Sequence, residues 1–432
     1  MIRSMAGCIV ALSAALVGGE PMGRPLLLTG ARLLDVTTGQ LGQGQDVFIT
    51  AGRIGIVGRN VAATTKLPAE TVTLDLSELV LMPGLIDLHT HLLLHPYDEA
   101  AWNDQVLKES LGLRTIRAVG AARATLQAGF TTIRDLGTEG AGYADVALRD
   151  AVTQGVMAGP RIYAVTRALV TTGGYGPAGF DPRWVMPKGA QVADGPASCR
   201  RAVREQIAAG ADWIKVYADY RRRPGDPSTP TFSMAELEAI IDEARSAGVP
   251  VAAHANTAEG MRRATLAGMQ TIEHGSGLTA EVAALMVERS VVLCPTLAAS
   301  EAMARYGGWN PGEKDHPGIV EAKRMMKIAL EAGVTIACGS DAGVFSHGDN
   351  AREIELMVEY GMKPLQALRA ATVTAAGVLG RRSDLGAVET GYAADLIAVR
   401  ANPLNDLGTL RRPVVVIKSG TVVVRPNGPT GQ

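Results

Sequence analysis

Eight short apolar segments occur in series between residues 85 and 341, and most of them are separated by amphipathic stretches of helical length. The segments read LIDLH, GFTTIRD, PRIYAV, DWIKVYA, VPVAAH, MQTIEH, VVLCPT and VTIACGSD. One separating stretch, SMAELEAIIDEARSAG, begins with the Ser233 and Glu236 pair of a capping box. Apolar strands that alternate with helices form a buried parallel sheet, so eight such units predict an α/β fold, a (β/α)8 TIM barrel, over residues 82–385.

Segments of a different character flank this region. Short β-rich runs broken by glycine turns fill residues 26–81, and similar runs recur over residues 386–426. Neither flank has a helical period. We therefore expect both chain ends to combine into one small, discontinuous β-sandwich domain beside the barrel.

The charge balance limits the partners of the chain. Its 42 Lys and Arg residues nearly match its 43 Asp and Glu residues. Such a chain has no net field that attracts nucleic acid or anionic membranes, so we expect neither as a partner. The four cysteines show no CxxC spacing, which argues against a disulfide framework or a structural zinc knuckle.

The N-terminal residues 1–19 have the outline of a signal peptide. An early arginine precedes a short apolar stretch that ends in small residues. This stretch is too short to span a bilayer as a helix, so we expect no stable membrane insertion. A signal peptide would direct the protein to the periplasm or the medium; without one, the protein would be cytoplasmic.

Two histidines close the first apolar segment of the predicted barrel. The chain has only 7 histidines in 432 residues, yet His89 and His91 stand one residue apart in LIDLHTH. Residues two apart on a strand face the same side. Barrel chemistry collects at the carboxyl ends of the strands. The pair is therefore a candidate for gripping one metal ion.

Other strands place further ligand types at the same end. His254, His274 and Asp341 end three later segments, and Lys215 lies within DWIKVYA. Each has an ordinary structural alternative, namely a hydrogen-bonded core histidine, a turn-forming aspartate or an ion-paired lysine. Their shared location favours a metal site, and imidazoles with a carboxylate suit a borderline cation such as zinc.

The ordered motifs GLIDLHTHL, IKVY, AHA, IEHG and GSDAG resemble the amidohydrolase superfamily over nearly the whole chain. The segment GYAADLIAV is similar to part of that superfamily's divided small domain. The resemblance implies two divalent metal ions, with zinc as the first expectation and manganese or cobalt as alternatives. It also implies a homo-oligomer, for example an octamer, that acts on a small-molecule amide or peptide.

The resemblance further implies a role for each ligand. His89, His91 and Asp341 would bind the more buried ion, and His254 and His274 the second. Carbon dioxide would convert Lys215 into a carbamate, whose two oxygens bridge both ions. Asp341 would also act as the catalytic acid and base, passing a proton to the leaving nitrogen.

Within the superfamily, the chain is similar to the branch of Xaa-Pro dipeptidases and ochratoxin-hydrolysing amidohydrolases. The similarity rests on KVYAD, GSDAGVFSHGDNAREIELMVEYGM and PLQALRAATVTAAGVLG. It implies release of a C-terminal amino acid from dipeptides or N-acyl amino acids, including phenylalanine from ochratoxin A. Tyr217 and His347 would hold the substrate, although barrel packing and a solvated loop are their structural alternatives.

One loop departs from this branch. VTTGGYGPAGF has Tyr175 where the branch often has a histidine that polarises the substrate carbonyl. A phenol donates a similar hydrogen bond but carries no charge near neutral pH. The segment 173–196 is either a substrate lid or a surface connection. The arginines of DYRRRPGD either attract a substrate carboxylate or are solvated.

Two rival functions stay open. A cyclic amide hydrolase of the dihydroorotase, hydantoinase or imidazolonepropionase kind would use the same fold and can retain the lysine. Deaminases of the superfamily generally use one metal and lack the bridging lysine, so Lys215 argues against them. A non-catalytic barrel scaffold would lack metal ligands, and this sequence lacks none of them.

Overall fold

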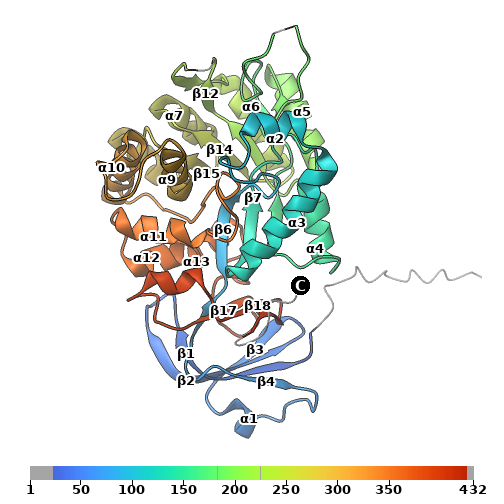
Figure 1. Cartoon of the computed structure of the whole chain (residues 1–432), viewed down its shortest axis with the longest axis vertical. Helices are drawn as coiled ribbons and strands as arrows, with labels where there is room; N and C mark the ends of the chain where they lie inside the picture. Colours follow the sequence, from blue (N-terminus) through green and yellow to red (C-terminus); the bar gives the residue numbers. More distant parts are fainter. Residues whose placement is uncertain (1–22, 182, 224, 426–432) are drawn as a thin grey trace, which may run out of the picture.

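The computed structural model describes residues 23–181, 183–223 and 225–425. It has a large body in which helices surround inner strands, and a sheet formed by both chain ends lies below that body (Figure 1). The predicted signal peptide, residues 1–19, lies outside the described residues. Within the described ranges, no helix combines the length and the apolar character needed to cross a bilayer.

The inner strands of the large body run parallel. Seven of the eight predicted segments contain a strand: β6 (Leu85–Thr90), β7 (Phe130–Asp135), β8 (Arg161–Ala164), β11 (Ile214–Tyr217), β14 (Val251–Ala255), β15 (Thr271–His274) and β16 (Val292–Cys294). The first three form one sheet; the other four join β9 (Leu169–Val170) and β10 (Gln191–Val192) in a second. Most of their residues are buried, as expected for strands covered on both faces.

The eighth predicted segment differs from the prediction. Its only β-bridge to the strand before it joins Ile336 to Leu293. Beyond that bridge it turns to β6, where Leu88 N donates to Cys338 O over 2.9 Å, and its backbone becomes left-handed at Asp341, with φ 62°. Because it divides its hydrogen bonds between two strands, it forms a regular ladder with neither. The described strands therefore form two parallel sheets, and no single closed eight-stranded sheet is present among them.

Helices follow the inner strands and cover them from outside (Figure 1). They are α2 (Trp102–Lys108), α3 (Leu111–Gln127), α4 (Ala144–Thr153), α5 (Pro196–Ala208), α6 (Met234–Ser246), α7 (Ala258–Ala267), α8 (Ala280–Glu288), α9 (Leu297–Tyr306), α10 (Pro317–Ala332), α11 (Ala351–Glu359), α12 (Pro364–Ala370) and α13 (Val373–Val378). The capping box predicted for Ser233 and Glu236 is confirmed at the start of α6, where each side chain accepts from the other's backbone N–H.

Both chain ends build the small sheet. It contains β1 (Leu26–Leu34), β2 (Leu41–Thr50), β3 (Arg53–Gly58), β4 (Val72–Asp75), β5 (Val80–Pro83), β17 (Leu396–Val399), β18 (Val415–Lys418) and β19 (Thr421–Val424). The short helix α1 (Val61–Thr64) and the 3-10 helix η1 (Leu407–Arg411) lie in its connections. The two chain ends meet where β5 pairs antiparallel with β17.

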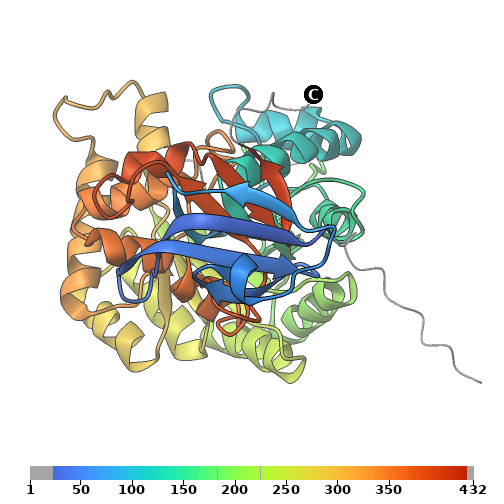
Figure 2. The same ribbon diagram turned by 90° about the horizontal axis from the view of Figure 1, so that it is seen from below.

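The small domain differs from the β-sandwich that the sequence predicted. Its eight strands form a single hydrogen-bonded sheet. The strands stay connected because β1 pairs with β4 through its first residues and with β5 through later ones. Buried apolar residues from both chain ends, such as Leu28, Ile49, Leu396 and Ile417, form one cluster. Seen from below, the sheet lies across the ring of helices (Figure 2).

Candidate active site

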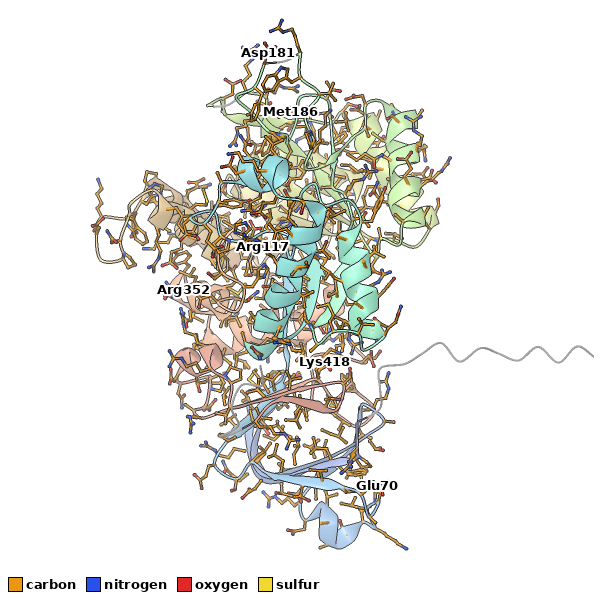
Figure 3. The ribbon with its side chains drawn as sticks, turned by 45° about the vertical axis from the view of Figure 1, so that its right-hand side comes forward. Glu70, Arg117, Asp181, Met186, Arg352 and Lys418 are labelled. Atoms are coloured by element: carbon orange, nitrogen blue, oxygen red, sulfur yellow. The ribbon has the colours of Figure 1, made fainter. Side chains whose placement is uncertain are left out.

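A cavity of about 780 Å³ lies at the carboxyl ends of the inner strands. Eight of the nine predicted site residues line it: His89, His91, Tyr175, Lys215, Tyr217, His254, His274 and Asp341. The loop that carries Tyr175 also carries Asp181 and Met186. These two residues lie at one end of the molecule, and the small sheet, near which Glu70 lies, is at the other end (Figure 3). The parallel strands therefore bring residues from distant parts of the sequence to one end of the fold.

His89, His91 and Asp341 lie close together in the cavity. Oδ1 of Asp341 lies 3.6 Å from Nε2 of His89 and 3.4 Å from Nε2 of His91. The two imidazole rings are 5.3 Å apart. Nδ1 of His91 donates to the Gly137 carbonyl over 2.9 Å, which leaves Nε2 for a ligand. Three ligand atoms thus point toward one small volume.

The left-handed backbone at Asp341 is held by hydrogen bonds to acceptors on β6. Asp341 N donates to His89 O over 2.7 Å. One residue earlier, Ser340 N donates to the buried carboxylate of Asp87 over 3.0 Å, and Asn350 Nδ2 donates to the same carboxylate over 2.8 Å. Burial raises the pKa of Asp341 well above its usual range, and the neighbouring Lys215 opposes this rise.

A fully enclosed network that the sequence reasoning missed lies beneath His89. Nδ1 of His89 donates to Oε2 of Glu273 over 2.8 Å. Oε1 of Glu273 accepts from Arg134 Nη2 over 2.8 Å, and the Arg134 guanidinium lies 4.3 Å from the centre of the Trp213 ring. One signal was available, since Arg134 and Glu273 are charged residues inside otherwise apolar strand segments.

His254 and His274 form a second imidazole pair, with ring centres 4.5 Å apart. His274 Nδ1 is hydrogen-bonded with Thr296 Oγ1 over 2.8 Å, and His254 Nε2 with Asn256 Nδ2 over 3.1 Å. Burial, and then the charge of Lys215 or a neighbouring histidine, lowers the pKa of both imidazoles well below its usual range. The neutral form of an imidazole is the form that binds a metal.

Lys215 lines the same cavity as the two histidine pairs and is 2% exposed. No carboxylate within the described ranges comes within 4 Å of its Nζ atom, so the ordinary ion-paired role does not apply to it. Burial lowers the pKa of its ammonium group, although the more distant Glu273 and Asp341 charges oppose this. A buried lysine without a salt bridge is costly as an ammonium ion and reactive as a neutral amine.

Aromatic residues form the wall above the histidines. The Tyr217 ring lies 4.7 Å from His254 and 4.3 Å from the Tyr175 ring, on which it stacks. Tyr220, which the sequence reasoning did not assign to the site, also lines the cavity. So does Arg221, one of the arginines expected either to attract a substrate carboxylate or to be solvated. The neighbouring Arg222 and Arg223 are exposed and do not line it.

His347 is the predicted site residue that the structure does not bring into the cavity. Its Nε2 atom donates to the His91 carbonyl over 3.2 Å, and its Nδ1 atom lies 3.4 Å from Thr125 Oγ1. The half-buried ring therefore lies behind the backbone of His91. The prediction that His347 touches the substrate does not agree with this placement, because the loop after Asp341 folds back over α3.

The donors that line the cavity fit a pair of divalent cations. Ligand atoms of His89, His274 and Asp341 all lie within 4.8 Å of one another. His91, His254 and Lys215 border the same space. Neutral imidazoles with one carboxylate are a suitable donor set for borderline metals.

Comparison with known proteins agrees with this geometry. The Amidohydrolase family matches residues 80–423. The ochratoxinase of Aspergillus niger is 35% identical over 390 residues, which cover 82% of this chain and 78% of that protein. The imidazolonepropionase of Symbiobacterium thermophilum is 26% identical over 378 residues, covering 80% and 81%. The crystal structure of a Xaa-Pro dipeptidase with bound methionine in the active site has a TM-score of 0.80 at 32% identity, covering 92% and 99%. The chain therefore belongs to the amidohydrolase family and is a hydrolase of amide bonds.

Proposed function

We propose that this protein is a binuclear metal-dependent hydrolase that releases a C-terminal amino acid from dipeptides or N-acyl amino acids. The observation that carries the proposal is the group of four imidazoles, Lys215 and Asp341 that lines one cavity. The similarity to an ochratoxinase and to a Xaa-Pro dipeptidase supports this substrate class. Ochratoxin A, with phenylalanine as the released amino acid, is among the proposed substrates.

The short distances from Asp341 to His89 and His91 support the ligand assignment that the resemblance implies. His89, His91 and Asp341 would hold the more buried ion, since Nε2 of each histidine lies within 3.6 Å of Asp341 Oδ1. His254 and His274 would hold the second. Lys215 would bridge the two as a carbamate formed with carbon dioxide, because its buried amine has no carboxylate partner within 4 Å in the described part of the chain. Zinc is our first expectation for both ions.

The residues of this chain have distinct tasks in the proposed reaction. When bound, two divalent ions lower the pKa of a water and polarise the scissile carbonyl. Asp341, at the edge of this site, accepts the proton of the attacking water and returns it to the leaving nitrogen. Tyr217, in the aromatic wall of the cavity, donates a hydrogen bond to the substrate. Arg221 attracts the substrate carboxylate, since it is the cavity-lining arginine of the Asp219–Arg221 strand β12.

We also infer that the inner strands form a closed (β/α)8 barrel. Two backbone contacts support closure. The contact from Leu88 N to Cys338 O links β6 with the eighth segment, and Asp212 N donates to Ala164 O over 2.7 Å, which links the start of the fourth segment with β8. Closure would hold the ligands of both histidine pairs on one rigid frame.

A cyclic amide hydrolase is the second candidate. The similarity to an imidazolonepropionase favours it, because that relative aligns with 80% of this chain. Such an enzyme would use the same metal ligands but would open a ring, with no amino acid released. Arg221 and the tyrosine wall would then face the ring substituents.

Chromatographic detection of free amino acids tests the proposal. The purified enzyme, supplied with zinc and bicarbonate, is incubated with Xaa-Pro dipeptides, N-acyl amino acids and ochratoxin A, with dihydroorotate and hydantoin as cyclic controls. Release of the C-terminal amino acid, abolished by a chelator and restored by zinc, is the expected result. Opening of the cyclic substrates alone would replace the first candidate with the second.

A metal assay separates catalysis from a scaffold role. Two ions per chain after purification with zinc and bicarbonate are expected, and no bound ions would revive the non-catalytic scaffold. The homo-oligomer implied by the resemblance stays a prediction, which light scattering of the same preparation tests. Export also stays a prediction, tested by N-terminal sequencing of the mature protein.

A further inference from the structure

Glu139 is a buried carboxylate next to the cavity that the proposed reaction does not use. It is 2% exposed and follows β7 in the loop DLGTEG. Its Oε2 atom accepts two hydrogen bonds, one from the Tyr175 hydroxyl over 2.5 Å and one from Trp102 Nε1 over 2.8 Å. A buried carboxylate needs such donors, since each replaces a lost water contact. Glu139 therefore joins α2 to the loop that carries Tyr175.

The position of Glu139 is set independently of Tyr175. Its backbone is left-handed, with φ 51°, a conformation that is rare for a residue with a side chain. Arg114, which is 3% exposed, stabilises this turn by donating to Glu139 O over 2.8 Å and to Leu93 O over 3.0 Å. The carboxylate is thus a fixed acceptor, to which the more exposed loop of Tyr175 is tied.

This contact determines what Tyr175 can offer to a substrate. A phenol has one O–H donor, and Glu139 receives it. The ring itself stacks on Tyr217 at 4.3 Å with an interplanar angle of 23°, and it lies 4.8 Å from the Trp102 ring. Tyr175 consequently presents its ring to the cavity, and its hydroxyl hydrogen points away from a substrate carbonyl.

We propose that Glu139 is a positioning residue that holds Tyr175 as an aromatic wall of the cavity, so that Tyr175 binds the substrate side chain and does not polarise the scissile carbonyl. This inference rests on the proposed hydrolysis of acyl amino acids. It replaces the expectation that Tyr175 polarises the substrate carbonyl, which came from its position in the loop VTTGGYGPAGF. It also implies that an apolar group of the substrate packs against the aromatic residues that line the cavity, among them Tyr175.

Kinetics of matched variants distinguish the ring from the hydroxyl. Tyr175→Phe keeps the ring and should raise KM about threefold while kcat falls less than about threefold. Tyr175→Ala removes the wall and should raise KM at least about tenfold for N-acyl phenylalanine, with a smaller effect for N-acyl alanine. Glu139→Ala should resemble Tyr175→Ala, and Tyr175→Phe should add nothing in the Glu139→Ala background.

A loss of kcat of about thirtyfold or more in Tyr175→Phe, with KM unchanged, would mean that the hydroxyl acts on the carbonyl, and would overturn the inference while leaving the proposed function intact. Zinc content serves as a control in every variant. It should not change, because His91 Nδ1 keeps its hydrogen bond to the Gly137 carbonyl in every variant.

Trp102 provides a readout that does not need turnover. Its indole N–H bonds to Glu139, so acrylamide quenching of its fluorescence reports on this contact. Glu139→Ala should increase quenching about twofold, and Tyr175→Phe should change it little. Comparison with Trp102→Phe shows which part of the fluorescence comes from Trp102. Unchanged quenching in Glu139→Ala would refute the proposal that Glu139 holds the aromatic wall in place. If quenching responds as expected but no acyl amino acid is cleaved, the positioning contact stands and the proposed function fails.

Discussion

Nδ1 of His89 lies 2.8 Å from Oε2 of Glu273, and both side chains are almost completely enclosed. A carboxylate can only accept, so the His89 proton is held on Nδ1 and the Nε2 lone pair faces Asp341. The ligand atom is therefore oriented before any metal binds.

Replacing Glu273 tests this orientation. Glu273→Gln should weaken zinc binding about 10- to 100-fold, because a neutral amide holds the imidazole less firmly and leaves the Arg134 charge unpaired. Competition with a chelating dye on metal-depleted enzyme measures the affinity. Glu259→Gln, on the exposed face of α7 where Glu259 pairs with Arg262, is the control. Equal affinities in both variants would contradict a role for Glu273 in ligand orientation.

Lys215 is expected to bridge the two metal sites. Lys215→Ala should lower the bound metal from two ions per chain to one or fewer, because the cavity loses both carbamate oxygens. A short carboxylate such as propionate fits the space left by the side chain and should restore part of the metal content. Metal analysis with and without propionate measures this. A variant that keeps two ions without added carboxylate would exclude the bridge.

Asp341 is expected to move the proton of the reaction. Asp341→Asn keeps an oxygen ligand but cannot accept the proton, so turnover should fall roughly a hundredfold or more while much of the metal stays bound. Asp349→Asn provides a control from the same loop, since Asp349 is exposed and pairs only with Arg411 among the described residues. Near-full turnover in Asp341→Asn would end the proposed role.

Glu353 on α11 should make stability depend on pH. Burial raises its pKa to about 8, although the backbone N–H of Ala298, 2.7 Å away, opposes the rise. A carboxyl whose pKa is higher in the folded than in the unfolded protein costs stability as pH rises from the unfolded pKa to the folded one. Glu353→Gln should therefore gain melting temperature relative to the parent between pH 5 and about 8.

Glu355 offers the opposite case two residues further along the helix. Although burial opposes it, hydrogen bonds from Arg411 and Arg352 hold the pKa of Glu355 below its usual value. Its contribution to stability is present at neutral pH and is lost in acid. Glu355→Gln should thus lower the melting temperature at pH 7 more than at pH 4. The same pH trend in both variants would contradict these two environments.

Local patterns were sufficient for most of the strands and for bringing the candidate metal ligands to one end of the fold. Alternation along a strand places His89 and His91 on one face, and the carboxyl ends of parallel strands bring His254 and His274 to the same end. Those properties depend on residues close in the chain. The eighth segment was wrongly predicted to be a regular strand, because its hydrogen-bond partners are set by the two strands between which it lies.

Tertiary structure decided what surrounds the ligands. Glu273 reaches His89 across 184 residues, and Glu139 reaches Tyr175 across 36. No local period predicts such pairs, because each depends on which strands are neighbours and how a loop crosses them. His347 shows the reverse case, since its motif pointed to the substrate but the folded loop placed it behind His91. The sequence by itself thus determined the ligand types and the end of the fold where they meet. Long-range packing alone decided their orientation and the wall that a substrate would face.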